Sequence, residues 1–278
     1  MTENANMNKT VFTFWEPRSA MPGYLRLCLE TWRKFLPGWQ IEVLDYERLP
    51  AFLPQDEIQA VVCHDMKLFN QADAIRCALL RRHGGVWLDL DTVVLRPNVL
   101  DRFADGEVSV ICSRKGGVYG SFFVAAKPNS ELMERWYGEL VVRVGEFRSF
   151  HASLVKRLFR RKRWRQVRRW DFVLNAVLDQ MVPDMSAMHV ARYSEEDLHV
   201  HPEQAFGRGE AYRKSREVYV DYWFSAPRGD DADVLAWSTG GMALLHNSWT
   251  PPEFRRMDEA SFLATGCRLA HVLKEVLG

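Results

Sequence analysis

The sequence predicts an α/β fold, and three observations lead to this prediction. Short apolar runs of strand type alternate with segments whose apolar residues recur at helical spacing. Gly and Pro pairs separate many of these runs. The chain has 278 residues, 47% of them hydrophobic and 12% aromatic, which is enough to bury a sizeable core. Strands that alternate with helices favour a sheet flanked by helices.

The amino-terminal elements follow a strand, loop, helix, strand order. Residues 11–16 (Val-Phe-Thr-Phe-Trp-Glu) predict a strand, and Pro22 with Gly23 marks a loop. An amphipathic helix is expected around residues 28–32, and a second strand over residues 40–45.

The central segment is the most informative part of the chain. Apolar residues at helical spacing predict a helix over residues 72–80, with Asp73 and Arg76 on one side because they are three residues apart. The Gly-Gly pair at 84–85 is expected to end the helix and turn the chain. The apolar run at 86–95 then predicts a buried strand.

Two aspartates interrupt this apolar run. Residues two apart in a strand point to the same face, so Asp89 and Asp91 are expected to bind one divalent ion. Oxygen ligands favour Mg²⁺ or Mn²⁺ over Zn²⁺. Such an ion is suited to holding a diphosphate and neutralising its charge as it leaves. A solvated acidic turn at a strand end would show the same D-x-D pattern.

The remaining elements complete the alternation. Strands are expected at 108–112 and 120–126, and a helix at 131–144. Near the carboxyl terminus, an apolar strand beginning at residue 242 leads into the polar sequence His246-Asn247-Ser248-Trp249.

Together these segments resemble the DXD-motif sugar transferases, a group that includes the capsular polysaccharide synthesis proteins, the Och-type mannosyltransferases and the clostridial glucosylating toxins. The shared core is Asp-x-x-Arg on a helix, a Gly-Gly turn, a strand and D-x-D. The resemblance implies a GT-A-type fold, a single Rossmann-like domain over 1–278 with a mixed, mainly parallel sheet flanked by helices. It also implies a nucleotide-sugar-binding half at 9–128 and an acceptor-side half at 129–278.

The resemblance assigns a role to each candidate site residue. Phe14 and Trp15 would form the aromatic wall beside uracil and ribose. Aromatic residues that only pack in the core would give the same sequence pattern. Asp73 and Arg76 would grip the donor sugar. The implied catalytic residues are Asp73, Arg76, Asp89 and Asp91. The implied metal ligands are Asp89, Asp91 and His246, and the implied nucleotide-sugar-binding residues are Phe14, Trp15, Asp73, Arg76, Asp89, Asn247, Ser248 and Trp249. The toxins have Ser-x-Trp where Ser248 and Trp249 are adjacent, which leaves the diphosphate donor open.

The implied activity is a hexosyltransferase that uses Mn²⁺ or Mg²⁺. It would move a sugar from a nucleotide-diphosphate donor, most simply a UDP-sugar, to a hydroxyl of a glycan or lipid-linked glycan. Retention of the anomeric configuration is implied, as is a role in bacterial capsule or cell-surface polysaccharide synthesis.

Two other functions stay open on the same residues. The run 86–92 also fits the D-x-D-x-T signature of haloacid dehalogenase-like phosphatases, with Asp89 as nucleophile and Asp91 as general acid. The acidic run at 229–233 imitates their later motif, but residues 225–228 before it predict a loop instead of a strand. A non-catalytic scaffold that docks to membrane or nucleic acid would leave both aspartates dispensable.

The net charge of +1 hides a basic segment at 156–170 that contains no acidic residue. Its interleaved aromatics suit an interfacial helix in which Leu158, Phe159 and Trp164 enter the headgroup boundary and arginines meet anionic lipid. A solvated helix or a site for an acidic acceptor would have the same composition. No nucleic-acid partner is expected, because no DNA- or RNA-binding motif accompanies the charge.

Cysteine usage and the amino terminus bear on localisation. Five cysteines without metal-binding spacing favour reduced thiols in the cytoplasm. Residues 1–9 lack the apolar segment of a signal peptide, and no run approaches the roughly 20 apolar residues of a membrane span. We therefore expect a cytoplasmic protein that can lie peripherally at the inner face of the cytoplasmic membrane.

Overall fold

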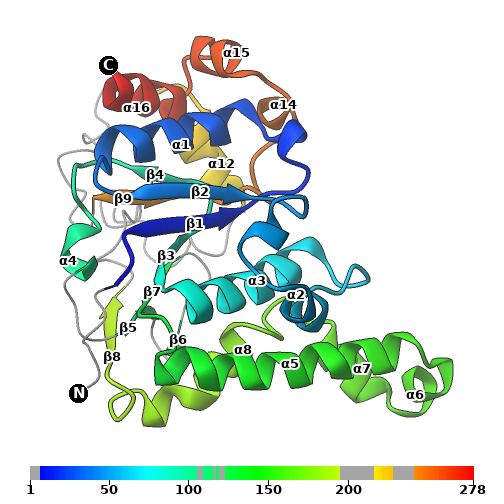
Figure 1. The fold of residues 1–278 in the computed structure, drawn as a ribbon. Helices are drawn as coiled ribbons and strands as arrows, with labels where there is room; N and C mark the ends of the chain where they lie inside the picture. Colours follow the sequence, from blue (N-terminus) through cyan, green and yellow to red (C-terminus); the bar gives the residue numbers. More distant parts are fainter. Residues whose placement is uncertain (1–6, 105–108, 115–116, 119–122, 195–215, 228–240) are drawn as a thin grey trace, which may run out of the picture. The chain divides into compact units, whose positions relative to one another are not determined.

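The computed structural model describes residues 7–104, 109–114, 117–118, 123–194, 216–227 and 241–278 (Figure 1). The chain forms two compact units. The first unit comprises Met1–Arg18, Trp39–Asp89 and Arg102–Tyr193, and the second comprises Ser19–Gly38, Leu90–Asp101 and Ser194–Gly278. Both contain helices and strands, so the α/β class is confirmed. The expected single domain with halves at 9–128 and 129–278 stays a prediction.

The first unit is built on a seven-stranded mixed sheet in the order β2-β1-β3-β7-β5-β6, with β8 also paired to β5. β1 pairs in parallel with β2 and β3, whereas β7 runs antiparallel to β3 and β5. The strands are β1 (Thr10–Phe14), β2 (Gln40–Leu44), β3 (Gly85–Leu88), β5 (Ser109–Arg114), β6 (Gly117–Val118), β7 (Phe123–Ala126) and β8 (Val190–Ser194). The expected mixed sheet flanked by helices is therefore present.

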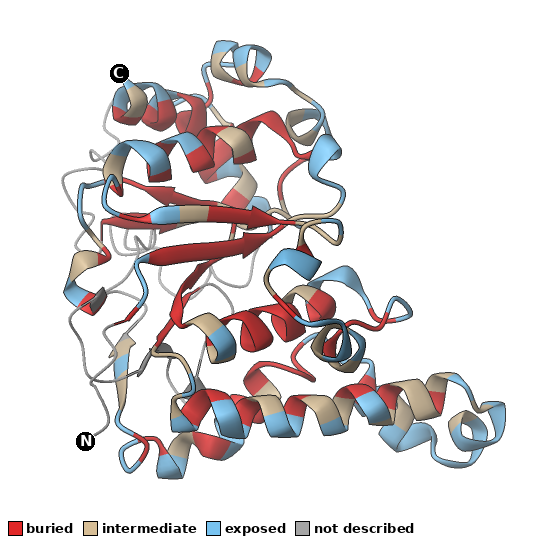
Figure 2. Ribbon diagram, in the orientation of Figure 1, coloured by how far each residue is buried: buried red, intermediate tan, exposed pale blue. Residues whose placement is uncertain are grey.

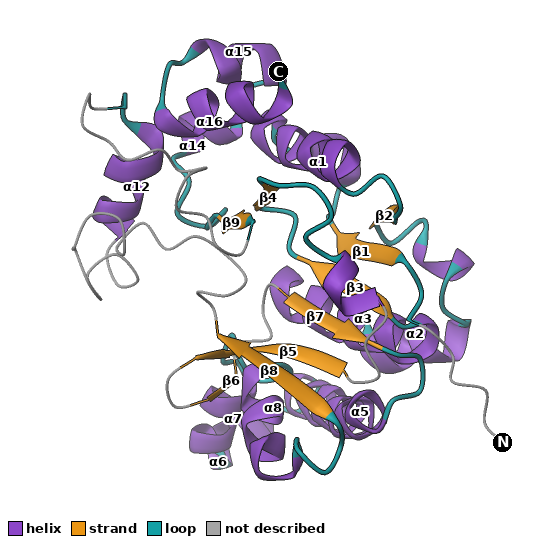
Figure 3. Ribbon diagram, turned by 90° about the vertical axis from the view of Figure 1, so that its left-hand side faces the viewer, coloured by secondary structure: helices purple, strands orange, loops and turns teal. Residues whose placement is uncertain are grey.

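Helices cover one face of this sheet (Figure 3). Phe12 and Phe14 of β1 and Trp87 of β3 belong to one buried core with side chains of α3 and α5. Figure 2 shows β1 and β3 buried along their whole length. The helices are α2 (Gln55–Val61), α3 (Leu68–His83), α4 (Asp101–Ala104), α5 (Glu131–His151), α6 (Leu154–Phe159), α7 (Arg161–Val167) and α8 (Asn175–Met181), with short 3-10 turns η2 (Leu49–Ala51) and η3 (Val182–Asp184).

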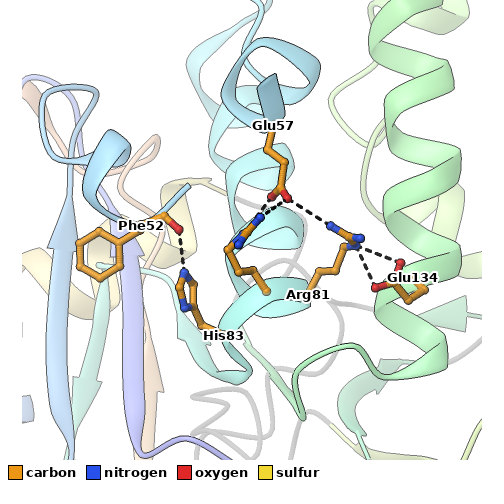
Figure 4. Close-up of polar contacts among 6 residues, drawn as sticks. Phe52, Glu57, Arg81, His83 and Glu134 are labelled. Carbon is orange, nitrogen blue, oxygen red and sulfur yellow. Dashed lines mark hydrogen bonds and ion pairs between the residues drawn. The ribbon is translucent and has the colours of Figure 1, made fainter. Parts of the chain in front are cut away.

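Charged side chains join three of these helices (Figure 4). Glu57 of α2 accepts hydrogen bonds from Arg82 (2.6 Å) and Arg81 (3.4 Å) of α3. Arg81 also pairs with Glu134 of α5 at 2.9 Å. The ring of His83 is hydrogen-bonded to the carbonyl oxygen of Phe52 at 2.7 Å. These contacts fix the carboxyl-terminal end of α3 just before the chain turns into β3.

The Gly-Gly pair ends α3 as expected. Gly84 has φ of +64° and Gly85 has φ of +97°, values that L residues with side chains rarely adopt. A Cβ on Gly85 would lie 2.5 Å from the carbonyl oxygen of Thr10, and one on Gly84 would lie 2.6 Å from Cδ of Pro128. Glycine is thus required twice for α3 to lead directly into β3.

The second unit packs helices around a two-stranded antiparallel sheet. Its elements are α1 (Gly23–Phe35), α12 (Arg216–Phe224), α14 (Pro252–Arg255), α15 (Glu259–Ala264), α16 (Arg268–Leu277), β4 (Thr92–Val94), β9 (Met242–Leu244) and most of the 3-10 turn η1 (Arg18–Ala20). Buried hydrogen bonds attach β4 to α1: the Trp32 indole donates to the Thr92 carbonyl at 2.7 Å, and the Val94 N–H donates to Thr31 Oγ1 at 2.9 Å.

The expectation of one strand through residues 86–95 is wrong. β3 ends at Leu88 and β4 begins at Thr92, and the two strands belong to different sheets. Asp89 and Asp91 follow and precede these strands on a connecting turn, so the alternation of side chains along a strand does not apply to them. No helix among the described residues is long and apolar enough to cross a membrane.

Candidate functional site

A buried guanidinium lies between two carboxylates in the first unit. The side chain of Arg76, on α3, is 3% exposed, and its Nη2 lies 3.1 Å from Asp73 Oδ1 and 2.9 Å from Asp89 Oδ1. The guanidinium also lies over the ring of Trp87, 4.7 Å from the ring centroid. The indole N–H of Trp87 donates to Asp89 Oδ1 at 2.8 Å. The structure thus brings together three predicted catalytic residues, Asp73, Arg76 and Asp89.

Burial raises the pKa of both carboxyl groups in this cluster. It raises the pKa of Asp73 from 3.8 to about 7; the charge of Arg76 opposes this rise and that of Asp89 adds to it. Burial also raises the pKa of Asp89, against the effects of Arg76 and the Trp87 hydrogen bond. One arginine cannot neutralise two ionised carboxylates, so the cluster favours either a proton on Asp73, which its raised pKa permits, or an additional cation or hydrogen-bond donor. Perturbed carboxylates of this kind are common at functional sites.

An aromatic group lies where β1 and β2 end. Phe14, the last residue of β1, is buried, and its ring centroid is 5.2 Å from that of Tyr46. The Tyr46 hydroxyl donates to Gln71 Oε1 at 2.6 Å, and Gln71 Nε2 donates to the carbonyl of Met66 at 2.8 Å. Neither Tyr46 nor Gln71 was predicted as a site residue from the sequence. Tyr46 could have been found, because it follows a strand parallel to β1 and such strand ends meet at one edge.

Trp15 follows β1 directly and is half-buried. Its backbone N–H donates to the Leu44 carbonyl at 2.9 Å, which extends the β1–β2 pairing by one residue. Its indole Nε1 is buried and has no hydrogen-bond partner among the described residues. A buried donor without a partner costs free energy, so this group is available to a bound ligand.

Asp91 organises the polar sequence near the carboxyl terminus, within the second unit. Its Oδ2 accepts the backbone N–H of Asn247 at 2.8 Å, and its carbonyl oxygen accepts the N–H of Leu245 at 2.8 Å. The side-chain oxygen of Asn247 accepts the hydroxyl of Tyr24 at 2.5 Å. Burial, together with the charge of Asp91, raises the pKa of Tyr24, which therefore stays a neutral donor.

Aromatic rings surround His246 in the same unit. Its ring centroid is 4.6 Å from that of Trp249 and 5.4 Å from that of Tyr219, and its backbone N–H donates to the Tyr219 hydroxyl at 3.0 Å. Ser248, in the turn between His246 and Trp249, is exposed. Of the predicted residues, the structure therefore gathers Asp91, His246, Asn247 and Trp249. Tyr219 was missed because it lies near no recognisable motif, and Tyr24 was missed because Pro22 and Gly23 before it indicate only a loop.

The carboxylates among the predicted ligands suit a hard divalent ion. Among residues that the structure describes, no three His, Cys, Asp or Glu side chains gather as a metal-binding group. Of the predicted ligands, Asp89 belongs to the first unit and Asp91 and His246 to the second. Carboxylate with imidazole fits Mn²⁺, and Mg²⁺ is commonly held by one or two carboxylates plus substrate phosphates. The acidic run at 229–233 lies outside the described residues.

Comparison with known proteins gives a family match that agrees with the motifs. The family profile described as "Capsular polysaccharide synthesis protein" matches residues 1–141, just over half of the chain. No protein of curated function matches. A solved structure titled "PaToxG Glycosyltransferase" aligns with a TM-score of 0.41 and 11% identity, over 66% of this chain and 73% of that chain. The profile confirms the resemblance that the motifs indicated. The chain belongs to the family of capsular polysaccharide synthesis proteins.

Proposed function

We propose that this chain is a glycosyltransferase that moves a sugar from a nucleotide-diphosphate donor, a UDP-sugar, to a hydroxyl of a glycan acceptor. The observation that carries the proposal is the ion-paired cluster of Asp73, Arg76 and Asp89, in a chain whose family makes capsular polysaccharide. Asp73 and Arg76 are buried and Asp89 is partly exposed. Carboxylates and a guanidinium fixed in such a cluster are suited to holding sugar hydroxyls, because sugars offer both donors and acceptors.

The first unit supplies groups for the base and the sugar. Phe14 and Trp15, with Tyr46 beside them, offer rings for the base and ribose and an indole N–H that no described residue uses. Asp73 and Arg76 bind the donor sugar. Since burial keeps the pKa of Asp73 near 7, its carboxyl can be neutral or ionised at physiological pH, and it can therefore donate or accept a hydrogen bond.

The resemblance to the sugar transferases, not a distance between side chains, assigns the groups that meet the metal and the diphosphate. On that basis Asp89, Asp91 and His246 would be ligands of Mn²⁺ or Mg²⁺, and Asn247, Ser248 and Trp249 would contact the diphosphate. The ion would offset the negative charge that grows on the departing diphosphate. Asp91 fixes the Asn247 backbone through a 2.8 Å hydrogen bond, which supports a preorganised turn at this point.

In the proposed reaction the bond between the anomeric carbon and the diphosphate oxygen breaks, and a bond to the acceptor oxygen forms on the same face. The acceptor proton passes to the departing diphosphate, so no protein nucleophile is needed and configuration is retained. Asp73 and Arg76 hold the sugar while its anomeric carbon gains positive charge. The acceptor would be a glycan or lipid-linked glycan of the capsule or cell surface.

The proposal also places the protein in the cytoplasm. Cys28, Cys63, Cys77 and Cys267 are all buried and free. Free thiols persist in a reducing compartment, which supports this placement.

A thermal-shift screen of the purified chain tests the proposal. UDP, GDP, CDP and ADP sugars are each added with and without Mn²⁺. A ligand at 100 times its Kd stabilises by about 2.7 kcal/mol, which raises the melting temperature measurably. We expect a manganese-dependent rise with a UDP-sugar. No rise with any nucleotide sugar, combined with phosphate-ester hydrolysis that Asp89→Asn abolishes, would favour the phosphatase instead.

A further inference from the structure

The basic segment of the first unit forms two helices instead of the expected one. α6 (Leu154–Phe159) and α7 (Arg161–Val167) meet at Arg160, whose φ of −116° and ψ of 44° interrupt the helix. Both lie at the carboxyl-terminal end of the long helix α5 (Figure 1). The break matters because it gives the two helices different surroundings.

α7 packs its aromatic residue inward. Trp164 is half-buried, with its ring centroid 5.8 Å from that of Phe147 and 6.1 Å from that of Phe150, both on α5. The guanidinium of Arg157 lies 5.9 Å from the same ring. The expectation that Trp164 enters a lipid headgroup region is therefore unsupported, because this side chain attaches α7 to α5.

α6 carries its apolar side chains outward. Leu154, Val155, Leu158 and Phe159 are spaced i, i+1, i+4 and i+5, which places them along one side of the helix. Phe159 is 85% exposed and the other three between 51% and 64%. No residue of α6 is buried. Single exposed apolar residues are ordinary, but four adjacent ones on one short helix indicate an interaction surface.

Exposed cations lie on the same two helices as this apolar face and between them. The exposed basic side chains of the two helices and of the residue between them are Lys156, Arg160, Arg161, Lys162, Arg163 and Arg165. Of these, Arg163 is paired with Glu146 of α5 at 2.6 Å. Residues 154–170 contain no Asp or Glu, so the remaining cations are not balanced within the segment.

We propose that α6 and the start of α7 form a docking surface for an anionic lipid bilayer. The apolar face of α6 enters the headgroup boundary, and Arg160, Arg161, Lys162 and Arg165 meet lipid phosphates. A soluble polyanion would use the cations but give no role to four outward apolar side chains, which is why the lipid surface is the better match. This inference is independent of the transfer reaction.

Vesicle co-sedimentation of the full chain tests the apolar half of the surface. We expect binding to phosphatidylglycerol/phosphatidylcholine vesicles and none to phosphatidylcholine alone. Replacing Leu158 and Phe159 with Ser should weaken binding about tenfold or more. Val142→Ser is the control, because Val142 is an exposed apolar residue on α5, with an exposed fraction of 67% that lies between those of Leu158 and Phe159. Each replaced side chain is exposed, so melting temperatures should stay unchanged.

A charge variant tests the other half. Replacing Arg160, Arg161, Lys162 and Arg165 with Gln removes four cations worth about 1 kcal/mol each at an anionic surface, so binding to the same vesicles should weaken on the order of a thousandfold. High salt should also weaken binding of the wild type. Three results would overturn the proposal: no binding of the wild type to anionic vesicles, unchanged binding of the Leu158/Phe159 variant, or binding to a soluble polyanion such as heparin in place of vesicles.

Discussion

Arg76 of α3 and Asp89, the residue after β3, form an ion pair with 2.9 Å between Nη2 and Oδ1. The same guanidinium holds Asp73, which lies one turn earlier on α3. The first aspartate of the D-x-D sequence is therefore tied to α3 through Arg76 and to β3 through the indole of Trp87. In this chain the arginine of the Asp-x-x-Arg sequence fixes that aspartate.

Removing this arginine should destabilise the chain. Arg76→Gln leaves the buried carboxylate of Asp73 and the partly exposed one of Asp89 without their cation, and we expect the free energy of unfolding to fall by about 3 kcal/mol. Arg135→Gln, which removes an exposed surface pair, should cost less than about 1 kcal/mol. Urea denaturation measures both. Equally small losses in the two variants would show that the ion pairs of Arg76 contribute no more to stability than an exposed surface pair.

The raised pKa of Asp73 makes stability depend on pH. Its pKa is about 7 in the folded chain and near 4 when unfolded, so the folded state binds more protons between these values. The contribution of Asp73 to the free energy of unfolding is therefore greatest below pH 4 and falls as pH rises to 7, by up to about 1.4 kcal/mol per pH unit.

Asp73→Asn removes this dependence, because asparagine does not titrate. The variant should become more stable relative to the wild type as pH increases from 5 to 8. Urea unfolding of both proteins across this range, without ligand or metal, provides the measurement. Parallel curves would mean that Asp73 has an ordinary pKa.

The Gly-Gly turn should not tolerate a side chain. Gly85→Ala places Cβ 2.5 Å from a backbone oxygen at positive φ, so we expect a loss of more than about 2 kcal/mol of stability. Gly138, in the middle of α5, has open space around its Cβ position. Gly138→Ala should therefore stabilise by about 0.8 kcal/mol. Thermal unfolding distinguishes the two, and a tolerated Gly85→Ala would contradict the turn geometry.

The hydrogen bond between Tyr24 and Asn247 should couple α1 to the turn after β9. Tyr24→Phe and Asn247→Ala each remove the 2.5 Å contact. In a double-mutant cycle the two losses of stability should overlap by about 1 kcal/mol. Strictly additive effects would show that the contact is not formed in solution.

Much of the fold could be predicted from local pattern. The helix expected at 72–80 lies within α3, and Gly84 ends it through a positive φ. The strand expected at 40–45 is β2, which ends one residue earlier, at Leu44. These features depend on neighbouring residues, for which hydrophobic spacing and glycine chemistry are direct signals.

The predictions were wrong or incomplete where the structure depends on contacts between residues that are distant in the sequence. The break at Asp89 depends on β4 pairing with β9, a strand about 150 positions later, instead of with the sheet of β3. Trp164 looked like an interfacial residue because its neighbours are cationic, but rings of α5 bury one side of it. Gln71 gave no signal, since its partner Tyr46 is distant in the sequence.

The most direct test of the proposed transferase is release of nucleoside diphosphate from nucleotide sugars by the purified chain, with and without Mn²⁺, compared between the wild type and Asp91→Asn. Asparagine can still accept the Asn247 N–H but lacks the charge proposed to hold the ion. We predict manganese-dependent release from a UDP-sugar, reduced at least about a hundredfold in the variant at unchanged melting temperature. Wild-type release by Asp91→Asn, or release that ignores Mn²⁺, would contradict the account.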